Sequence, residues 1–447
     1  MYLITFYAPD NIRKKFFQIV LKLPDLPEKT KRPTIYIPGL FDFVTTEIIN
    51  ALPNIANIFA VRVGLWLTDF ERAIQVFYRV KGGQEDFGVY RPDLCGCRFN
   101  RYGRKHKGRF KEWDENNPIT LISHSQGSGT CLYLQILLEK NNDPTSEFYN
   151  LLVDENGKPY KTSAKWIRNY LTIAASHNGS TILHFFSSLK DGNLTYGPND
   201  YFFLFFNFLF QFIVGAHNFG KKYNIPFIAN FFDPNIDHRD NSSLEKLIIN
   251  KKNCSYLQAL AVNSVYERNK QFSYSKHINY QHIKASTTFK DGDFQTPYFV
   301  TGILFSISAY IIGHTTDVKE FMFDNFDAKE WRENDGATST ISQGLINWKE
   351  NEKKYKDRIV IAETDDEMWE LFKCPRKLNG KIMQFKLNGI DHLQISMFGI
   401  IFNTNILYNL RFIGNYFYMV KQLEKDDKID DEMSYYQKNK SINRVFK

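Results

Sequence analysis

The residues best suited to chemistry surround Ser125, in the stretch 118–130 that runs Pro-Ile-Thr-Leu-Ile-Ser-His-Ser-Gln-Gly-Ser-Gly-Thr. Residues 120–123 are typical of a short buried strand, and the leucines and isoleucines that follow from Leu132 indicate a helix. Small residues at Ser123 and Gly127 allow strand and helix to pack closely around the serine. A serine on such a turn can serve as a nucleophile. The competing interpretation is a serine that caps the helix N-terminus.

A nucleophilic serine needs a base to accept its proton and a carboxylate to orient that base. In α/β-hydrolases the three occur in the order Ser, Asp or Glu, His. Among ten histidines, His392 is favoured, because it follows a predicted strand in a turn-forming stretch at residues 388–391. His314, at a predicted helix end, and His282, in a polar strand-like segment, are weaker candidates for the base.

Asp335 is the favoured carboxylate, because it lies in an Asp-Gly turn inside the run Trp-Arg-Glu-Asn-Asp-Gly-Ala at residues 331–337. Glu333 and Asp391 are its rivals. A second serine, Ser342, begins a Ser-Gln-Gly sequence that resembles the turn at Ser125, but no predicted strand precedes it. We therefore set Ser342 aside as a nucleophile.

The negative charge that develops on a substrate carbonyl needs two backbone N–H donors. One is expected at Gln126, directly after the candidate nucleophile, and the other on the loop after an early strand. Residues 34–40, Thr-Ile-Tyr-Ile-Pro-Gly-Leu, provide that strand and loop. Leu40 is therefore the expected second donor to the oxyanion hole.

Predicted strands alternate with helix-capable stretches and give an α/β fold with a mostly parallel central sheet flanked by helices. Residues 181–300 interrupt this alternation with aromatic, helix-like spacing, so they are expected to form a large helical lid or cap. The expected hydrolase domain spans 34–420, after an N-terminal extension at 1–33 and before a charged tail at 421–447. Strands are predicted at residues 34–40, 120–123, 167–175, 359–361 and 381–387.

Aromatic residues make up 16% of the 447 residues, more than a compact core requires, which predicts an apolar surface that contacts lipid. Tyr201–Gly215 and Pro297–Gly313 are apolar but interrupted by polar residues, so we expect buried or lipid-touching helices rather than membrane spans. The net charge of +8 is dispersed except in the run Arg98–Arg109. A solvated basic loop is favoured there over a site for anionic lipid, and nucleic acid is not an expected partner.

The five cysteines cannot all pair, and Cys95 and Cys97 are too close for an ordinary structural bridge, so a disulfide framework is not expected. The first residues lack the pattern of a secretory signal peptide. The expected location is therefore either the cytoplasm or outside the cell after export by a secretion machine. Composition predicts no oligomeric state.

Four separated motifs resemble the large bacterial triacylglycerol lipases of the staphylococcal and thermophilic bacillus type. The Ser-His-Ser-Gln-Gly at 123–127 is similar to their Ala-His-Ser-Gln-Gly, and Thr-Ile-Ala-Ala-Ser-His-Asn-Gly-Ser-Thr at 172–181 to a second motif. Glu-Asn-Asp-Gly at 333–336 and Asp-His-Leu at 391–393 match the motifs that carry the family's acid and base. The resemblance covers roughly residues 34–400 and implies a triad of Ser125, Asp335 and His392 in an α/β-hydrolase with a helical lid.

The sequence departs from this family at its metal sites. The zinc ligands of the family, two Asp and two His, correspond to Glu71, Arg91, Cys97 and Asp237, and a neutral-pH arginine cannot be a ligand. A zinc set that uses Cys95 and Cys97 is the alternative. At the family's calcium loop stand Gln394 and Gly399, which disfavour calcium. We therefore expect no metal and no cofactor.

Three functions follow from these residues. The leading one is a serine lipase or esterase that hydrolyses carboxylic esters of lipids through an acyl-enzyme on Ser125. The second is a phospholipase acting on membranes, and one form of it is a secreted antibacterial effector. The basic run and the lack of a signal-peptide pattern in the first residues suggest this alternative. The third is a lipid-binding or interaction protein on a hydrolase scaffold without activity.

Overall fold

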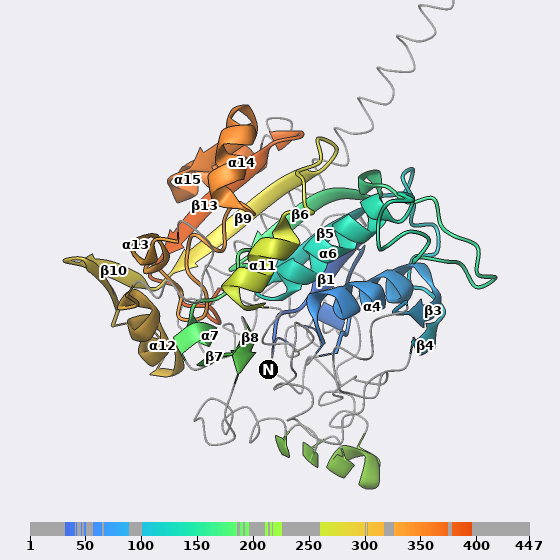
Figure 1. Cartoon of the computed structure of the whole chain (residues 1–447), viewed down its shortest axis with the longest axis horizontal. Coiled ribbons are helices and arrows are strands. Elements are labelled where there is room, and N and C mark those ends of the chain that lie inside the picture. The colour runs from blue at the N-terminus through green and yellow to red at the C-terminus, as the bar shows by residue number, and fades with distance from the viewer. Residues whose placement is uncertain are drawn as a thin grey trace, which may run out of the picture.

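Short runs rich in isoleucine, leucine and valine form a seven-stranded sheet in which every neighbouring pair is parallel. Parallel sheets have both faces covered, which explains why most of these runs are rich in apolar residues. Figure 1 shows this sheet running through the centre of the computed structural model. Across the sheet the order is β12 (Ile359–Ala362), β13 (Ile382–Asn388), β9 (Asn279–Ser286), β6 (Ile167–Ile173), β5 (Ile119–His124), β1 (Thr34–Ile37) and β2 (Ile58–Ala60).

The structure describes residues 32–88, 101–195, 211–225, 260–316, 326–373 and 378–395, with shorter gaps inside these ranges. The expected tail at 421–447, nearly all of the N-terminal extension, and residues 226–259 of the expected insertion lie outside the described residues. Most of the apolar segment Tyr201–Gly215 lies outside them as well. The division into an extension, a hydrolase domain and a tail therefore stays a prediction.

The five predicted strands are confirmed as β1, β5, β6, β12 and β13. The sequence placed residues 279–286 inside the lid insertion, and that boundary is wrong, because these residues form β9 between β6 and β13. The strand contains buried polar side chains that find partners on β6: Asn279 donates to Asn169 over 2.9 Å, and His282 lies 2.9 Å from the Thr172 hydroxyl. These pairings make a polar segment stable in the middle of the sheet.

Side chains alternate between two hydrophobic cores, one on each face of the sheet. Ile35 and Leu121 belong to the first core, with residues of α4 (Asp69–Lys81) and α6 (Gly127–Lys140). Tyr36 and Ile122, the next residues along the same strands, belong to the second core, with Met368 of α15 (Asp365–Lys373). In Figure 1, α4 and α6 lie over the near face of the sheet. This two-residue period is what a strand covered on both faces requires.

Smaller elements surround the sheet. Three antiparallel pairs of strands are β3 (Gly83–Asp86) with β4 (Tyr102–His106), β7 (Ser188–Lys190) with β8 (Asn193–Thr195), and β10 (Thr288–Asp291) with β11 (Phe294–Pro297). The remaining α-helices with complete bounds are α7 (Ile182–Phe185), α11 (Val262–Asn269), α12 (Ile303–Gly313), α13 (Ala328–Trp331) and α14 (Trp348–Lys354). Short 3-10 helices precede β6 at Ala164–Trp166 and β12 at Lys356–Arg358.

The basic run at 98–109 is not the loop that the sequence favoured, because its described part contains strand β4, paired with β3. Two residues of this run bind carboxylates of β3. Arg101 makes a bidentate ion pair with Asp86, and His106 lies 2.6 Å from Glu85. Part of the positive charge of this run is therefore matched within the hairpin.

The apolar segment Pro297–Gly313 is divided between the end of β11 and helix α12. Among the helices that the structure describes, none combines the length and the hydropathy needed to cross a bilayer. Helix α12 contributes both buried and exposed apolar side chains: Ile312 is fully buried, whereas Ile307 is 67% exposed.

Candidate active site

Ser125 lies on the turn between β5 and α6 with a φ of 54°, in the left-handed region that non-glycine residues rarely adopt. Two glycines make room for this turn. A Cβ on Gly39 would lie 2.6 Å from the Cβ of Ser125, and one on Gly127 would lie 2.2 Å from the carbonyl oxygen of Ile37. Both approaches are closer than a side chain tolerates, so the strained serine depends on glycine at these positions.

The alternative that Ser125 caps helix α6 does not fit this geometry. The residue at the N-cap is Gln126, and no side chain caps that position. Ser123, the small residue two positions before Ser125, is fully buried, and its hydroxyl lies 3.2 Å from the hydroxyl of Ser128. The serine is thus accommodated inside the turn by a polar partner on the helix.

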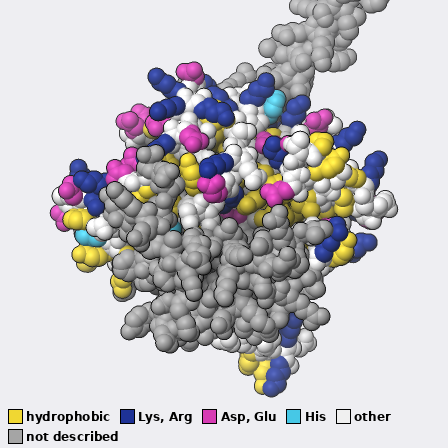
Figure 2. Space-filling view, in the orientation of Figure 1, with side chains coloured by type: hydrophobic (Ala, Val, Ile, Leu, Met, Phe, Trp, Pro, Cys, Tyr) yellow, Lys and Arg dark blue, Asp and Glu magenta, His cyan; other side chains and the backbone are white. Residues whose placement is uncertain are grey.

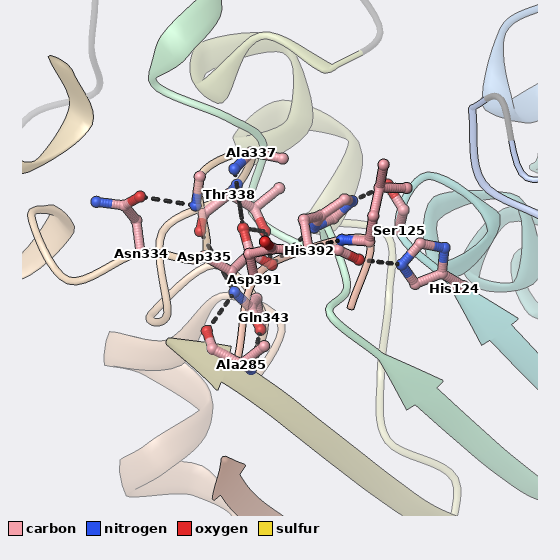
Figure 3. A network of polar contacts seen from close by, with 12 residues as sticks. His124, Ser125, Ala285, Asn334, Asp335, Ala337, Thr338, Gln343, Asp391 and His392 are labelled. Atoms are coloured by element: carbon pink, nitrogen blue, oxygen red, sulfur yellow. Dashed lines mark hydrogen bonds and ion pairs between the residues drawn. The ribbon is translucent and has the colours of Figure 1, made fainter. Parts of the chain in front are cut away.

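The structure brings together the three residues that the sequence singled out. The Ser125 hydroxyl oxygen lies 2.8 Å from Nε2 of His392, and Nδ1 of the same ring lies 2.6 Å from Oδ2 of Asp335 (Figure 3). Because a carboxylate accepts hydrogen bonds, the Nδ1 proton points to Asp335, which leaves Nε2 free to accept the serine proton. This is the arrangement that activates a serine hydroxyl as a nucleophile.

Asp335 is fully buried, and its own loop fixes the direction of its carboxylate. Its Oδ1 accepts from the backbone N–H groups of Ala337 at 2.9 Å and Thr338 at 2.8 Å, which leaves Oδ2 for His392. The backbone N–H of His392 also donates to the carbonyl of Asp335 over 3.0 Å. Acid and base are therefore joined through both backbone and side chains.

The electrostatic surroundings of His392 favour a proton on its ring. Burial alone would lower the pKa of His392, but the carboxylate of Asp335, with smaller contributions from Asp391 and Asp42, raises that pKa above its ordinary value. A base with a raised pKa accepts the serine proton more readily and carries the resulting positive charge at lower cost.

The rival carboxylates are engaged elsewhere. Glu333 forms an ion pair of 2.8 Å with Lys386. Asp391 accepts from the backbone N–H groups of Leu393 and Gln394, in the turn that carries His392. Both lie near the site, and Asp335 is the carboxylate that reaches Nδ1 of the histidine.

The other candidate groups also have structural partners. His314 stacks on Tyr310 with ring centroids 3.9 Å apart, and its Nδ1 contacts the carbonyl of the same residue. His282 is enclosed in the sheet, where burial holds its pKa well below the ordinary value. The hydroxyl of Ser342 donates to the carbonyl of Gly179 over 2.6 Å.

The two expected oxyanion donors flank the serine. Neither the backbone N–H of Leu40 nor that of Gln126 donates to another group among the residues that the structure describes. The sequence reasoning missed the side chain that joins their two loops. Arg72, buried on α4, donates both to the side-chain oxygen of Gln126 and to the carbonyl of Pro38.

The first turn of α4 carries a signal that could have located Arg72. Thr68 and Glu71 form a capping box, in which the Glu71 carboxylate accepts from the backbone N–H and hydroxyl of Thr68, both at 2.8 Å. The Thr-x-x-Glu pattern predicts where this helix begins, and Arg72 follows it directly. The start of α4 is therefore fixed close to the candidate oxyanion hole.

A second buried ion pair anchors the same region. Arg268 of α11 donates to the Asp69 carboxylate over 2.7 Å and to the carbonyl of His177 over 2.9 Å. This contact gives the motif at 172–181 a structural role, because it holds His177 in the interior. The next residue, Asn178, is held there by a bond from its backbone N–H to the hydroxyl of Ser342. Burial lowers the pKa of His177 to about 3. The histidine of that motif is neutral and structural.

The described residues contain no group of three or more His, Cys, Asp or Glu side chains arranged to hold an ion. Glu71, one of the positions corresponding to the family's zinc ligands, is committed to the capping box, and Gln394 contacts the backbone of Asp391. Arg91, Cys95, Cys97, Asp237 and Gly399 lie outside the described residues, so the expected absence of metal stays a prediction.

The parallel sheet, the serine on its strand-to-helix turn, and the aligned histidine and aspartate define the fold of an α/β-hydrolase. The chain belongs to the family described as lipase-like, C-terminal domain, whose model matches residues 45–369. This match confirms the resemblance to bacterial lipases of the staphylococcal type that the motifs indicated.

Individual relatives agree with this assignment. Lipase 2 of Staphylococcus aureus is 24% identical over 349 residues, which cover 72% of this chain and 46% of the relative. The chain thus spans about half the length of the curated relatives it matches. Lipase 1 of the same organism is 26% identical over 284 residues, covering 62% of this chain and 38% of the relative.

Two solved structures show a similar fold. The Staphylococcus hyicus lipase superposes with a TM-score of 0.60 at 18% identity, covering 91% of this chain and 99% of that one. EstA from Clostridium botulinum gives 0.58 at 17% identity, covering 89% and 90%. At these identities the likeness establishes the architecture and leaves the chemistry to the site.

Proposed function

We propose that this protein is a lipase or esterase that hydrolyses carboxylic esters of lipids through an acyl-enzyme. The observation that carries the proposal is the continuous chain from Ser125 Oγ through His392 to Asp335, with contacts of 2.8 and 2.6 Å. Membership of the lipase-like family supports the same reaction class.

In the proposed reaction, Ser125 attacks the ester carbonyl while Nε2 of His392 takes the hydroxyl proton. Asp335 keeps the imidazole in the required tautomer and stabilises the imidazolium. The backbone N–H groups of Leu40 and Gln126 stabilise the oxyanion. His392 then gives its proton to the departing alkoxide, and afterwards it activates the water that releases the fatty acid from Ser125.

Helix α12 supports contact with an apolar substrate surface. Its Phe305 ring centroid lies 6.1 Å from that of His392, so the helix extends over the candidate site. On the same segment Phe299 is fully exposed, and Ile307 and Tyr310 are 67% and 52% exposed. Figure 2 shows hydrophobic side chains at the left edge of the molecule, where α12 and β10 lie in Figure 1. A helix that carries exposed apolar side chains and also reaches the base suits an ester presented at a lipid surface.

The test compares wild-type protein with Ser125→Ala on a soluble short-chain ester and with a fluorophosphonate probe. We expect loss of at least about 10⁴-fold in kcat and loss of labelling. The matched control is Ser273→Ala, at an exposed serine before β9, which should retain both. Retained activity in Ser125→Ala, or an unlabelled and inactive wild-type protein, would refute the proposal.

Substrate class is tested with triolein emulsion and phosphatidylethanolamine vesicles. Ile307→Asp should reduce hydrolysis of emulsified triolein while the soluble ester is cleaved at the wild-type rate, because a charge on α12 opposes contact with an apolar surface. If Ile307→Asp hydrolysed emulsified triolein and the soluble ester both at wild-type rates, the role of α12 would be refuted. Fatty acid released from the phospholipid and not from triolein would identify a phospholipase instead.

A further inference from the structure

We propose that His124 and Asp42 form a second buried histidine–carboxylate pair, which positions the base by holding the backbone carbonyl of His392. This inference rests on the proposed function, because it concerns the same triad. His124 is a positioning residue in this account, since it acts through His392 and does not reach the reacting atoms.

The pair lies directly behind the triad. His124 is the last residue of β5, next to Ser125, and is buried. Its Nε2 lies 3.0 Å from the carbonyl oxygen of His392, and its Nδ1 lies 3.2 Å from Oδ2 of Asp42. Figure 3 shows the His124 ring pointing toward the His392 backbone, on the other side from Asp335. The hydroxyl of Tyr36 on β1 donates to the same Asp42 oxygen.

These contacts join three segments that the proposed reaction needs in register. Asp42 lies two residues after the expected oxyanion donor Leu40, His124 precedes the nucleophile, and His392 carries the base. The backbone of His392 is then held on both sides: its N–H donates to Asp335 at 3.0 Å, and its carbonyl contacts His124. With the backbone fixed, the position of the imidazole depends on its side-chain torsions alone.

The carbonyl that faces His124 defines which of its ring nitrogens carries a proton. A carbonyl only accepts hydrogen bonds, so Nε2 of His124 must carry a proton. Nδ1 lies 3.2 Å from the Asp42 carboxylate without the alignment of a hydrogen bond. The Nε2 contact with the His392 carbonyl is therefore the directional link between the two residues.

The titratable groups around His124 are few and come from different elements. Tyr36 on β1 and Asp42 on the following loop lie on one side, and the ring of His392 lies on the other, with centroids 4.9 Å apart. The negative charge of Asp42 contributes to the raised pKa of the neighbouring His392. Removal of the Asp42 charge should therefore be visible in the pH dependence of catalysis.

The experiment uses the full chain on a soluble short-chain ester, with three variants. His124→Phe keeps the ring volume and removes the donor, and we expect kcat to fall roughly 10- to 100-fold with KM unchanged, because a displaced base loses alignment with the serine. His124→Gln keeps an amide donor to the His392 carbonyl and should recover most of kcat. Thermal unfolding establishes that each variant folds.

Asp42→Asn is the third variant and tests the charge. It preserves shape while removing a negative charge near His392, so the acid limb of the kcat profile should move to lower pH. It also keeps the inference testable if His124→Phe does not fold. His124→Phe at wild-type kcat, equal impairment of the Phe and Gln variants, or an unmoved acid limb in Asp42→Asn would each overturn the role. These outcomes presuppose an active wild-type enzyme, and an inactive wild type would refute the proposed function itself.

Discussion

Removal of the ion pair between Arg268 and Asp69 should clearly lower the free energy of unfolding of this protein. This ion pair joins α11 to the start of α4, and both side chains are buried, with exposed fractions of 6% and 1%. The 2.7 Å bond accompanies a second bond from Arg268 to the carbonyl of His177. Replacement by methionine keeps most of the side-chain volume but leaves Asp69 without its closest cation.

The expected cost follows from the burial of both partners. Across 2.7 Å the gross attraction is about 6 kcal/mol at an effective dielectric constant of roughly 20, offset in the native pair by desolvation. Removing one partner leaves the other charge buried, so Arg268→Met should lower the free energy of unfolding by about 3–5 kcal/mol. Burial already raises the pKa of Asp69, against the opposing effect of Arg268 and Arg72.

The pH dependence gives the sign of the effect. Without Arg268 the pKa of Asp69 in the folded state rises further above its unfolded value. The carboxyl group then favours the folded state below the unfolded pKa, and this contribution is lost as pH rises through the folded pKa. The variant should therefore be destabilised more at pH 8 than at pH 5, relative to wild type.

The assay is urea unfolding at both pH values, with a double-mutant cycle. Asp69→Asn combined with Arg268→Met should be more stable than Arg268→Met alone, because no charge is left buried. The matched control is Lys270→Met, since Lys270 bonds to Glu267 over the same 2.7 Å on the surface, where solvent screens the pair and little change is expected. Additive single effects, or a penalty independent of pH, would refute this reasoning.

Two further predictions concern close packing and buried histidines. Gly127→Ala should cost about 1–3 kcal/mol or more and abolish esterase activity, because its Cβ would lie 2.2 Å from a backbone carbonyl. Gly215→Ala, which meets nothing within 4 Å, should behave as wild type in the same urea and esterase assays; equal behaviour of the two variants would contradict the clash. Burial lowers the pKa of His177 to about 3 and of His184 to about 4, so stability should fall below about pH 6.5, by about 1.4 kcal/mol per pH unit for each histidine. Urea unfolding of His184→Asn across pH 4–7 should give a shallower slope than wild type, and an unchanged slope would exclude this residue as a source.

Much of the sheet was predictable because its strands are apolar and short. Residues 34–40 and 167–175 indicated strands from composition alone, and the structure contains β1 and β6 there. β9 escaped this reasoning because Asn279 and His282 are polar, and their partners lie 110 residues away on β6. A local pattern cannot indicate that a polar group will be satisfied by a distant strand.

The candidate triad was accessible for a different reason. Serine, aspartate and histidine occur in a fixed order with turn-forming neighbours, so sequence order substitutes for geometry. Arg72 and His124 carry no such signal, because a charged residue in a helix and a histidine at a strand end are both common on surfaces. Only their burial and their contacts with Pro38 and with the carbonyl of His392 reveal them.

The buried charges also bear on why the strained backbone persists. Ser125 and Ala174, at the carboxyl ends of the neighbouring strands β5 and β6, both have positive φ, at 54° and 46°. Such residues cost on the order of 1–3 kcal/mol each and persist only where the surroundings determine them fully. Here the backbone N–H of Ser125 donates to the carbonyl of Ile173 over 3.0 Å, and the backbone N–H of Ala174 donates to that of Ile283 over 2.9 Å, so each strained residue is bonded to the next strand. Arg72 of α4 also binds this end of the sheet, through its hydrogen bonds to Gln126 and to the carbonyl of Pro38. Buried ion pairs contribute little net stability, but they restrict geometry, and this end of the sheet is where a fixed geometry matters to the proposed reaction.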